Sequence, residues 1–544
     1  MVNMLDVVVR VLGPFIDYVA THYRPLAMMV VVLPLSFLMR LFVLARDYAL
    51  EHVLVKSTHE EKVRRVVGHV KERLQLPAKD RKFMCTARAP WMNLSTRFAD
   101  YKKNSSCIFV GDLNNVLELD EENLVVRVEP LVDVGKITRY LVARGYMLAT
   151  TLEIEEATIG GLAMAVGMTT ASHKFGLLQE TVVEYEVVTG TGELLSVTKS
   201  SHPDLFKAIP WSHGSICLLV SLKLEIIRIK PFVRVDYVPI TDGLASYCAK
   251  IREVSLAKQP ADFVEATIFS KKEAVVMTGR FVSKPDSDGA VNHVGRWYKP
   301  WFWVHVRDSV LPVGKDVVEY IPTYEYIFRH NRGVFWTLKD QLPEKYGNNV
   351  VFRYVFGWLM PPNVTFLKLP ATPAIRREMM LERVYQDIVL PMNVLEESIQ
   401  VAADLFGIFP LLVYPSRIYD HGSDQGQFRR PKNKVAGEEY GMYYDLGIYG
   451  IPAAIEENKP FKTVTSMRKM EAFTRKAGGA PFLYADTFMD FDEFKEMFDL
   501  ELYDKVRDKY QAVDHFPHLF AKTSGCQSFD WKQLLLEEQS KKVN

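Results

Sequence analysis

Residues 158–176 read TIGGLAMAVGMTTASHKFG and combine glycines, hydroxyl side chains and a histidine within a short stretch. Gly160, Gly161 and Gly167 interrupt small apolar residues, and a glycine has no side chain to hold a ligand away from the backbone. Consecutive amides that point inward form a nest for an anion such as a pyrophosphate, and the apolar residues suit a flat aromatic cofactor. A glycine-rich loop packed in a core has the same composition, so the segment alone leaves both interpretations open.

Other side chains in and around this stretch have acid–base chemistry. His173 follows the glycines directly, and it is either an acid–base group or a hydrogen-bonded histidine that shapes the loop. His213, within PWSHGS, has the same two interpretations. The acidic cluster Glu153, Glu155 and Glu156 favours a solvated turn. HExxH, P-loop and GxSxG motifs are absent from the sequence, and we expect no metal site.

The elements expected around this stretch are short and mixed. An amphipathic helix is predicted over 59–76, and a hairpin is predicted around the acidic turn 120–123. Asp133 is a candidate N-cap for a further helix, and 190–192 predicts a second hairpin turn. No GxGxxG motif follows a predicted strand, so a Rossmann site is not expected. The pattern therefore indicates an α+β fold with antiparallel strands.

Composition sets the size and class of the protein. The chain has 544 residues, of which 48% are hydrophobic and 24% charged, so it is globular and long enough for two or three domains. Its net charge of +1 gives no support for binding to nucleic acid. The five cysteines are scattered, without a CxxC pair, which is typical of a reducing compartment rather than a disulfide framework.

The N-terminal region contains a long apolar run. Residues 26–39 are uncharged and lie between Arg24 and Arg40, and the run reaches the ~20 residues of a membrane-spanning helix if it continues to Ala45. We therefore predict an N-terminal transmembrane helix at about 25–45, single-pass, in preference to a cleaved signal peptide, since no small-residue cleavage site follows. Lys and Arg are more numerous after this run than before it, which predicts that the large C-terminal part faces the cytosol.

Several segments together resemble a known family. They are KFMCTARAPW (82–91), the glycine segment, VFRYVFGWLMPP (351–362), YYDLGIYGIP (443–452) and LYADTFM (483–489). This succession resembles the FAD-binding proteins of the vanillyl-alcohol oxidase superfamily, and within it the delta-24-sterol reductase family. The similarity runs from about residue 59 to residue 522.

The resemblance implies a fold and a cofactor site. It implies a two-subdomain FAD-binding domain over 56–230 and an α+β substrate (cap) domain over 231–450. These are preceded by a membrane anchor over 1–55 and followed by a segment over 451–544 that packs back on the flavin domain. FAD is expected to be non-covalent. The residues expected to contact it are Thr158, Ile159, Gly160, Gly161, Leu162, Ala163, Met164, Ala165, Val166, Gly167, Met168, Thr169 and Thr170, and Arg88 and Trp91 lie in a segment that resembles a first phosphate loop.

The resemblance also implies an activity. It implies reduction of the 24(25) double bond of a sterol with NADPH, in sterol synthesis or conversion at the endoplasmic reticulum membrane, beside other sterol-pathway enzymes. An isolated alkene cannot accept hydride alone, so an acid must add a proton. His173, Tyr484 and Asp486 are the candidates for that acid, each with a structural hydrogen bond as its alternative.

Two alternatives stay open at this point. The same superfamily contains oxidases of sugar alcohols and lactones, and a membrane scaffold that retains the fold without flavin has the same pattern. The aromatic run at 297–303 is expected to line a sterol pocket, to lie at the membrane surface, or to belong to the core.

Overall fold

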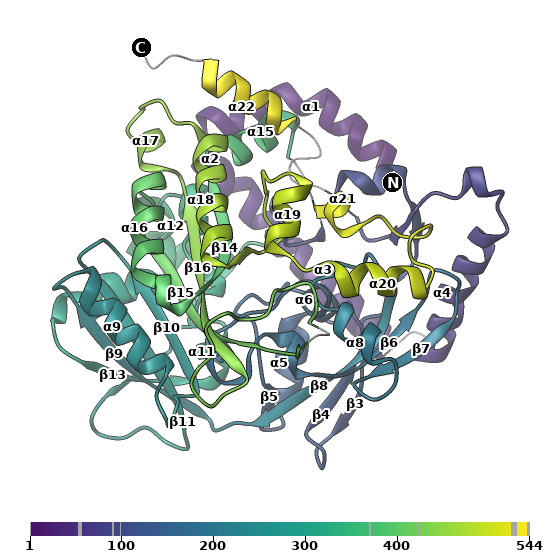
Figure 1. The fold of residues 1–544 in the computed structure, drawn as a ribbon. Coiled ribbons are helices and arrows are strands. Elements are labelled where there is room, and N and C mark those ends of the chain that lie inside the picture. The colour runs from purple at the N-terminus through teal and green to yellow at the C-terminus, as the bar shows by residue number, and fades with distance from the viewer. Residues whose placement is uncertain are drawn as a thin grey trace.

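The computed structural model describes residues 2–52, 57–89, 92–97, 99–368, 371–422, 425–523 and 530–540. The chain forms two β-sheet bodies with helices on their outer faces, and two long N-terminal helices lie against the outside (Figure 1). The mixture of helices and mostly antiparallel strands expected from the sequence is confirmed. The predicted phosphate-loop residue Trp91 lies outside the described residues.

The first body is a six-stranded sheet that carries the glycine segment on one side. It contains β3 (Val116–Asp120), β4 (Val125–Val128), β5 (Tyr146–Leu148), β6 (Val182–Val188), β7 (Leu194–Thr198) and β8 (Leu218–Arg228), in the order β3-β4-β8-β6-β7 with β5 beside β8. A separate parallel pair is formed by β1 (Met84–Thr86) and β2 (Ser106–Ile108). The hairpins predicted around 120–123 and 190–192 are confirmed as β3–β4 and β6–β7.

The second body is a nine-stranded sheet. Its order is β12 (Ala290–Val291), β13 (Val317–Pro322), β9 (Phe232–Ile240), β11 (Ala274–Val282), β10 (Phe263–Ile268), β15 (Leu411–Tyr419), β16 (Tyr440–Gly450), β14 (Val384–Pro391) and β17 (Ala480–Pro481). Successive side chains of a strand point to opposite faces. On β16, Tyr444, Leu446 and Ile448 therefore pack under helices, while Asp445 and Tyr449 face the first body.

Helices cover the outer face of the nine-stranded sheet. They are α9 (Leu244–Ser255), α16 (Leu395–Phe406), α17 (Ala453–Glu456), α18 (Thr463–Ala477) and α22 (Trp531–Ser540). Although α18 and α22 follow the predicted boundary at residue 450, they pack with this sheet, whereas α20 (Glu501–Lys509) packs on α8 (Pro203–Ala208) of the first body. The contacts of the predicted C-terminal segment are thus divided between the two bodies, and the boundary itself stays a prediction.

Shorter helices form the connections between these elements. They are α5 (Val134–Val142), α6 (Ile159–Met164), α7 (Ser172–Phe175), α10 (Phe302–His305), α11 (Thr323–Ile327), α12 (Glu344–Gly347), α13 (Val350–Phe356), α14 (Val364–Leu367), α15 (Pro373–Leu381), α19 (Phe491–Met497) and α21 (Leu519–Thr523). The N-cap predicted at Asp133 is confirmed, because its carboxylate accepts a hydrogen bond from the Lys136 N–H at 2.6 Å.

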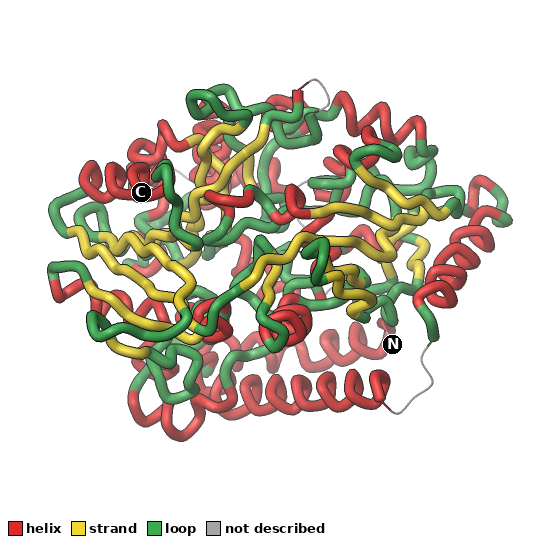
Figure 2. Tube along the Cα trace, turned by 90° about the horizontal axis from the view of Figure 1, so that it is seen from below, coloured by secondary structure: helices red, strands yellow, loops and turns green. Residues whose placement is uncertain are grey.

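The N-terminal region is a helical hairpin. Helix α1 (Val2–His22) is followed by α2 (Arg24–Ala27), a π-helical turn η1 (Met28–Val32) and α3 (Leu33–His52). The stretch Arg24–Arg46 is the described helix that is long and apolar enough to cross a membrane, and only 17% of its most apolar window is buried. In Figure 2, both long helices run along one edge of the molecule. The predicted apolar N-terminal helix is confirmed in extent, as a candidate membrane segment.

Helix α4 (His59–Leu74) is held to the six-stranded sheet by an ionic cluster at its first residue. His59 Nδ1 lies 2.9 Å from a Glu129 oxygen, and Nε2 lies 2.8 Å from a Glu186 oxygen. Burial by itself would lower the pKa of His59, but the hydrogen bonds and charges of the two carboxylates outweigh it and raise the pKa to about 9. His59 is therefore protonated in the folded protein at neutral pH and donates from both ring nitrogens.

We expect His59→Gln to destabilise the protein in a pH-dependent way. The folded-state pKa of about 9 lies above the ordinary value of 6.5, so the stabilisation is complete below about pH 6.5 and is lost as pH rises through about 9. At pH 6.5 we expect a loss of about 2–3 kcal/mol from the charged hydrogen bonds. Urea unfolding in detergent measures this loss. His69→Gln, on the same helix, is the control; equal, pH-independent losses in both variants would contradict the assignment.

Candidate active site

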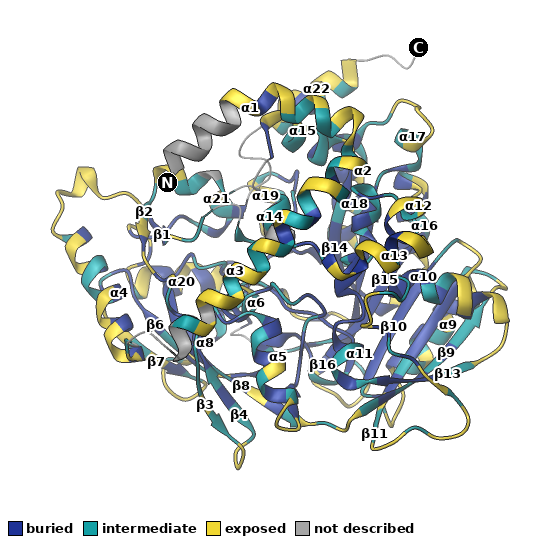
Figure 3. Cartoon of the chain, turned by 180° about the vertical axis from the view of Figure 1, so that it is seen from behind, coloured by how far each residue is buried: buried dark blue, intermediate teal, exposed yellow. Residues whose placement is uncertain are grey.

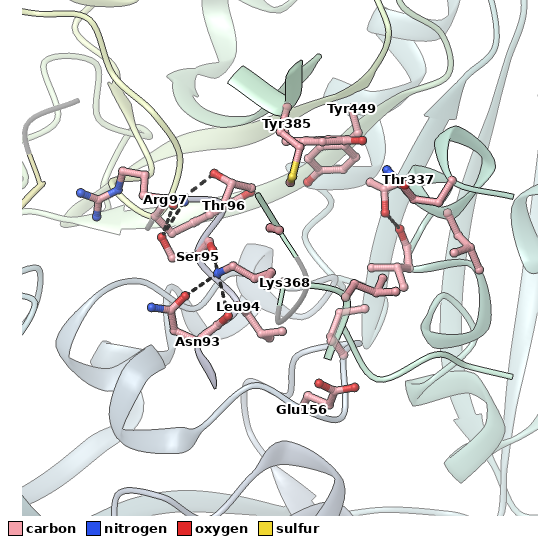
Figure 4. Close-up of a pocket in the computed structure, with 18 of the residues that line it drawn as sticks. Asn93, Leu94, Ser95, Thr96, Arg97, Glu156, Thr337, Lys368, Tyr385 and Tyr449 are labelled. Atoms are coloured by element: carbon pink, nitrogen blue, oxygen red, sulfur yellow. Dashed lines mark hydrogen bonds between the residues drawn. The ribbon is translucent and has the colours of Figure 1, made fainter. Parts of the chain in front are cut away.

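A large cavity lies where the two sheets and the N-terminal hairpin meet. Its volume is about 1210 Å³, above the roughly 300–1,000 Å³ of a site for one small molecule. The wall is mostly apolar, with polar groups gathered in two places (Figure 4). One polar group comes from the loop 93–97 and Lys368, and the other comes from strands β14 and β16. The cavity has room for a cofactor together with a second ligand.

The glycine segment contributes one face of a short helix to this cavity. The lining members are Thr158, Gly161, Leu162, Ala165, Val166 and Met168. The other predicted FAD contacts are buried away from the cavity: Ile159, Gly160, Ala163, Met164, Gly167, Thr169 and Thr170. The division follows the helical spacing of α6, which puts residues three and four apart on the same side. Contact with FAD stays a prediction for each of them.

The three glycines are required for different reasons. A Cβ at Gly160 would lie 2.4 Å from the Pro130 side chain, and a Cβ at Gly167 would lie 2.8 Å from that of Leu178. At Gly161, which is exposed to the cavity, the one close neighbour of a Cβ is Thr158 Oγ1 at 2.9 Å. Gly160 and Gly167 therefore permit tight packing, while Gly161 keeps side-chain atoms out of the cavity.

Cationic side chains gather at one end of the cavity. Arg88 donates to Thr158 Oγ1 at 3.2 Å, and Lys368 Nζ donates to Asn93 Oδ1 at 2.6 Å. Lys522 Nζ donates to the Gly214 carbonyl at 3.0 Å. Burial lowers the pKa of both lysines to about 7, because desolvation disfavours their charged forms. In Figure 4, Lys368 reaches the loop at Asn93 and Ser95.

This end of the cavity suits an anion. Arg97 lines it beside these cations, donating to the Leu483 and Lys522 carbonyls, yet its buried Nε has no hydrogen-bond partner among the described residues. The buried Nε2 of His213 also has none. Buried cations gathered this closely, one of them with an unpartnered donor, need an anionic ligand or extensive hydration. The pyrophosphate of FAD has the charge and the acceptor oxygens that these residues lack.

A carboxylate and two phenols form the polar group on the sheet side. Asp387 of β14 accepts one hydrogen bond from the Tyr449 hydroxyl and one from the Tyr484 hydroxyl, and all three line the cavity. Burial raises the pKa of Asp387 to about 6, although both phenol hydrogen bonds oppose the shift. The ring of Tyr449 lies over Gly447, where a Cβ would come within 2.7 Å of the Tyr449 hydroxyl. The absence of a side chain at Gly447 makes this pairing possible.

Further carboxyl groups nearby are buried and poorly partnered. Glu153 Oε2, Asp445 Oδ1 and the Tyr414 hydroxyl have no partner among the described residues, and all three side chains line the cavity. Burial raises the pKa of Glu153 to about 8 and that of Asp445 above its usual range. The solvated turn favoured for Glu153 is therefore wrong, because that side chain is buried under the nine-stranded sheet. Neutral acids with unused oxygens fit the polar edge of a flavin.

The three predicted acid–base residues lie in different surroundings. Tyr484 lines the cavity, whereas Asp486 lies beside Arg97 and Lys368, outside the lining, and counters their charge. His173 does not line the cavity: Nδ1 lies 3.0 Å from the Thr170 carbonyl and Nε2 lies 2.9 Å from the Ala261 carbonyl. Burial lowers the pKa of His173 to about 4. The geometry favours Tyr484 and gives His173 the loop-shaping role.

Sequence reasoning missed most of the cavity wall. Asp387 and Lys368 belong to no recognised motif, and the 93–97 loop contains only common polar residues. Tyr449 and Asp445 lie within YYDLGIYGIP. In a strand, alternate residues lie on the same face of the sheet, so the sequence could have placed these two side chains on one face. The aromatic residues of the 297–303 run lie in two environments. Trp301 and Trp303 are core residues, whereas Trp297 is on the surface beside Tyr354.

Comparison with known proteins adds family evidence to this geometry. A family model described as an FAD binding domain matches residues 53–198. A Delta(24)-sterol reductase of Macaca fascicularis is 36% identical over 515 residues, covering 94% of this chain and 95% of that protein. A homolog of that enzyme in Caenorhabditis elegans is 34% identical over 93% of this chain and 95% of its own. The Pisum sativum Delta(24)-sterol reductase is 33% identical, over 93% and 92%.

We expect Gly161→Val to weaken FAD binding, because its branches would project into the cavity beside Thr158. A strain of about 1–3 kcal/mol corresponds to a roughly 5- to 150-fold rise in Kd. FAD fluorescence released on heating measures occupancy. Gly68→Val is the matched control, since a Cβ at Gly68 meets nothing within 4 Å. Full occupancy in a folded Gly161→Val protein would put the cofactor elsewhere.

Proposed function

Because the chain belongs to the Delta(24)-sterol reductase family, we propose that it uses NADPH and non-covalent FAD to reduce the 24(25) double bond of a sterol. The observation that carries the proposal is the cavity itself, which has a cationic end, an acid–phenol group and an apolar outer part. FAD binding is supported by the domain match over 53–198, and membership of the oxidoreductases is supported by the reductase relatives. We assign NADPH as the hydride donor on chemical grounds, because the reduction requires a source of hydride.

The division of the chain is part of the proposal. The β1–β2 pair and the six-stranded sheet would form the two subdomains that hold FAD in the vanillyl-alcohol oxidase manner, within 56–230. The nine-stranded sheet would form the substrate domain, within 231–450. Arg88, Arg97, Lys368 and Lys522 would hold the pyrophosphate, with Gly161 giving it space. When bound, FAD supplies the hydride acceptance and donation that no side chain provides.

The chain's own residues must supply the proton. Protonation at carbon 24 leaves positive charge on tertiary carbon 25, which the hydride quenches, so proton and hydride have to arrive together. We assign the proton to the Tyr484 hydroxyl in the state in which Asp387 is a neutral acid and donates to the Tyr484 oxygen, because the phenolic hydrogen is then free for the sterol. As the phenol gives its proton to carbon 24, Asp387 passes its own proton to the phenol oxygen, and the resulting carboxylate is later reprotonated by water. Tyr449, on the other oxygen of Asp387, holds that carboxyl in place.

The cavity wall beside this proton path is mostly apolar. Leu412, Tyr414 and Phe482 line the cavity beside Asp387, and water would otherwise compete for the developing charge. The aromatic faces of the tyrosines stabilise a transient cation at carbon 25. The cavity therefore combines an acid with an apolar wall of a size that suits a sterol side chain.

Location follows from the substrate. The confirmed apolar helix near the N-terminus supports membrane attachment, and we place the protein at the endoplasmic reticulum membrane with its catalytic part in the cytosol, where NADPH and other sterol-pathway enzymes are accessible. The substrate class is a 24(25)-unsaturated, desmosterol-like sterol.

Isotope labelling tests the reaction and its direction. In heavy water with ordinary NADPH, the saturated sterol is expected to carry solvent deuterium at carbon 24. Hydride from NADPH is expected at carbon 25, provided that it does not first exchange with solvent. Deuterium only at carbon 25 would reverse the polarity. Peroxide without saturated sterol would favour a sugar-alcohol or lactone oxidase. No turnover, with no uptake of FAD, would favour a scaffold.

Substitution of one phenol tests the proton donor. Tyr484→Phe is expected to lower kcat about 10²- to 10⁴-fold, the usual contribution of an acid, while bleaching of bound FAD by NADPH continues at the normal rate. Tyr385→Phe is the matched control, because Tyr385 also lines the cavity but donates to Asp340 at 2.8 Å. Equal effects of the two substitutions, or slowed bleaching in Tyr484→Phe, would remove Tyr484 from this role.

A further inference from the structure

One side of the molecule exposes an unusual number of large apolar side chains. They belong to α1, to the Arg24–Arg46 helix and to α13: Val11, Leu12, Phe15, Tyr18, Leu26, Val30, Leu35, Leu38, Phe42, Val350, Val351, Tyr354 and Val355. We call this set the apolar face. Its most exposed members, Val351 and Val11, retain 72% and 71% of their accessible surface. Exposed helices cross this side of the molecule in Figure 3.

The Arg24–Arg46 helix lies against the body rather than projecting from it. Arg24 donates to Glu378 at 2.6 Å, and Leu33 is fully buried. The Ser36 hydroxyl accepts a hydrogen bond from the Asn363 N–H, and the Phe37 ring meets Trp358 edge-on at 5.1 Å. A helix that crossed the bilayer perpendicular to the surface would leave all these contacts. The contacts therefore favour a helix lying along the membrane.

Helix α13 is joined to this helix. Trp358, which contacts Phe37, lies in the turn after α13, and Tyr354 of α13 stacks on Tyr298 at 5.7 Å. Trp297 packs edge-on against Tyr354 at 6.0 Å. Trp and Tyr side chains are enriched where a protein meets the lipid headgroups. The apolar face thus has aromatic residues in α13 and its neighbours as well as in the N-terminal hairpin.

The cavity reaches the apolar face between α1 and η1. Its outer lining includes Ile16 and Val19 of α1, together with Ala27, Val31 and Val32. The helix changes there to a π-helical turn, which is a common feature of functional sites in helices. The apolar surface outside and the apolar cavity wall inside are therefore continuous. A lipid-dissolved molecule would pass from one to the other without crossing water.

We infer that the apolar face lies in one leaflet of a bilayer, with the Arg24–Arg46 helix parallel to the membrane plane, and that the sterol enters from that leaflet between α1 and η1. An apolar surface of this extent is rare on a soluble monomer and marks an interaction site. Because this apolar surface is continuous with the apolar cavity wall, we take the partner to be membrane lipid rather than another protein. The entry route rests on the proposed function, whereas the position of the helices does not.

Depth measurements test the position. Single cysteines at Leu26, Leu35, Phe42 and Val351 carry an environment-sensitive fluorophore in full-length protein reconstituted into phosphatidylcholine vesicles, with nitroxides near the headgroup or near the chain end. A helix lying in the plane gives similar, shallow quenching at Leu26→Cys, Leu35→Cys, Phe42→Cys and Val351→Cys. Leu256→Cys, exposed at the end of α9, is the unquenched control, and unsubstituted chain corrects for native cysteines.

The contrary results are distinct. A spanning helix would put Leu35→Cys deepest, with Leu26→Cys and Phe42→Cys nearer to opposite headgroups, and would leave Val351→Cys in water. That pattern would overturn the inference. None of these quenching measurements requires the protein to be catalytically active. An inactive protein with the flat depth profile would therefore reject the proposed function and leave the membrane position intact.

The entry route has its own test. Ala27 lines the cavity mouth, so Ala27→Trp is expected to raise KM for vesicle-dissolved sterol about tenfold while NADPH still bleaches bound FAD at the normal rate. Ala45→Trp, on an exposed turn of the same helix, is the matched control. Equal KM for the two variants would place the entrance elsewhere.

Discussion

The burial of positive charge at one end of the cavity constrains the rest of the structure. Arg88, Arg97, Lys368 and Lys522 are taken out of water, and burial disfavours their charged forms. Backbone carbonyls satisfy part of their donors, and Asp486 counters part of their charge. A bound dianion would complete the neutralisation. Folding of this region and binding of a phosphorylated cofactor are therefore thermodynamically linked, because the same ligand relieves the same unfavourable burial.

The second constraint is that segments far apart in the sequence must come into contact at the cavity. Tyr484 is held at both ends: its hydroxyl donates to Asp387 of β14, and its carbonyl accepts from the Ser95 hydroxyl. This single residue links the loop beside the cations to the nine-stranded sheet. It therefore couples the geometry of the acid group to that of the anion site. The neutral carboxyls of Glu153 and Asp445 are tolerated in the same region because protonation removes most of the cost of burying them.

The apolar surface of the N-terminal hairpin is explained by the apolar cavity beneath it. A cavity with an apolar outer part needs an entrance through which an apolar ligand can pass, and the N-terminal hairpin provides apolar side chains on both its surface and its cavity side. Only a small share of the Arg24–Arg46 helix is buried. Its apolar side chains therefore serve both the outer surface of the protein and the wall of the cavity. Its few body contacts, through Arg24, Ser36 and Phe37, are sufficient to orient it.

Local signals in the sequence determined the parts of the protein that depend on neighbouring residues. The cap at Asp133, the two hairpins, the apolar N-terminal helix and the glycine segment are of this kind, and family resemblance supplied the cofactor class. Tertiary structure alone decided which glycine faces the cavity, because Gly160 and Gly167 differ from Gly161 only in what packs against them. It also decided that Glu153 is buried, that Asp387 joins Tyr449 and Tyr484, and that Lys368 meets Asn93. Those groups are brought together by strand register and chain closure over hundreds of residues, and no local pattern records such pairings.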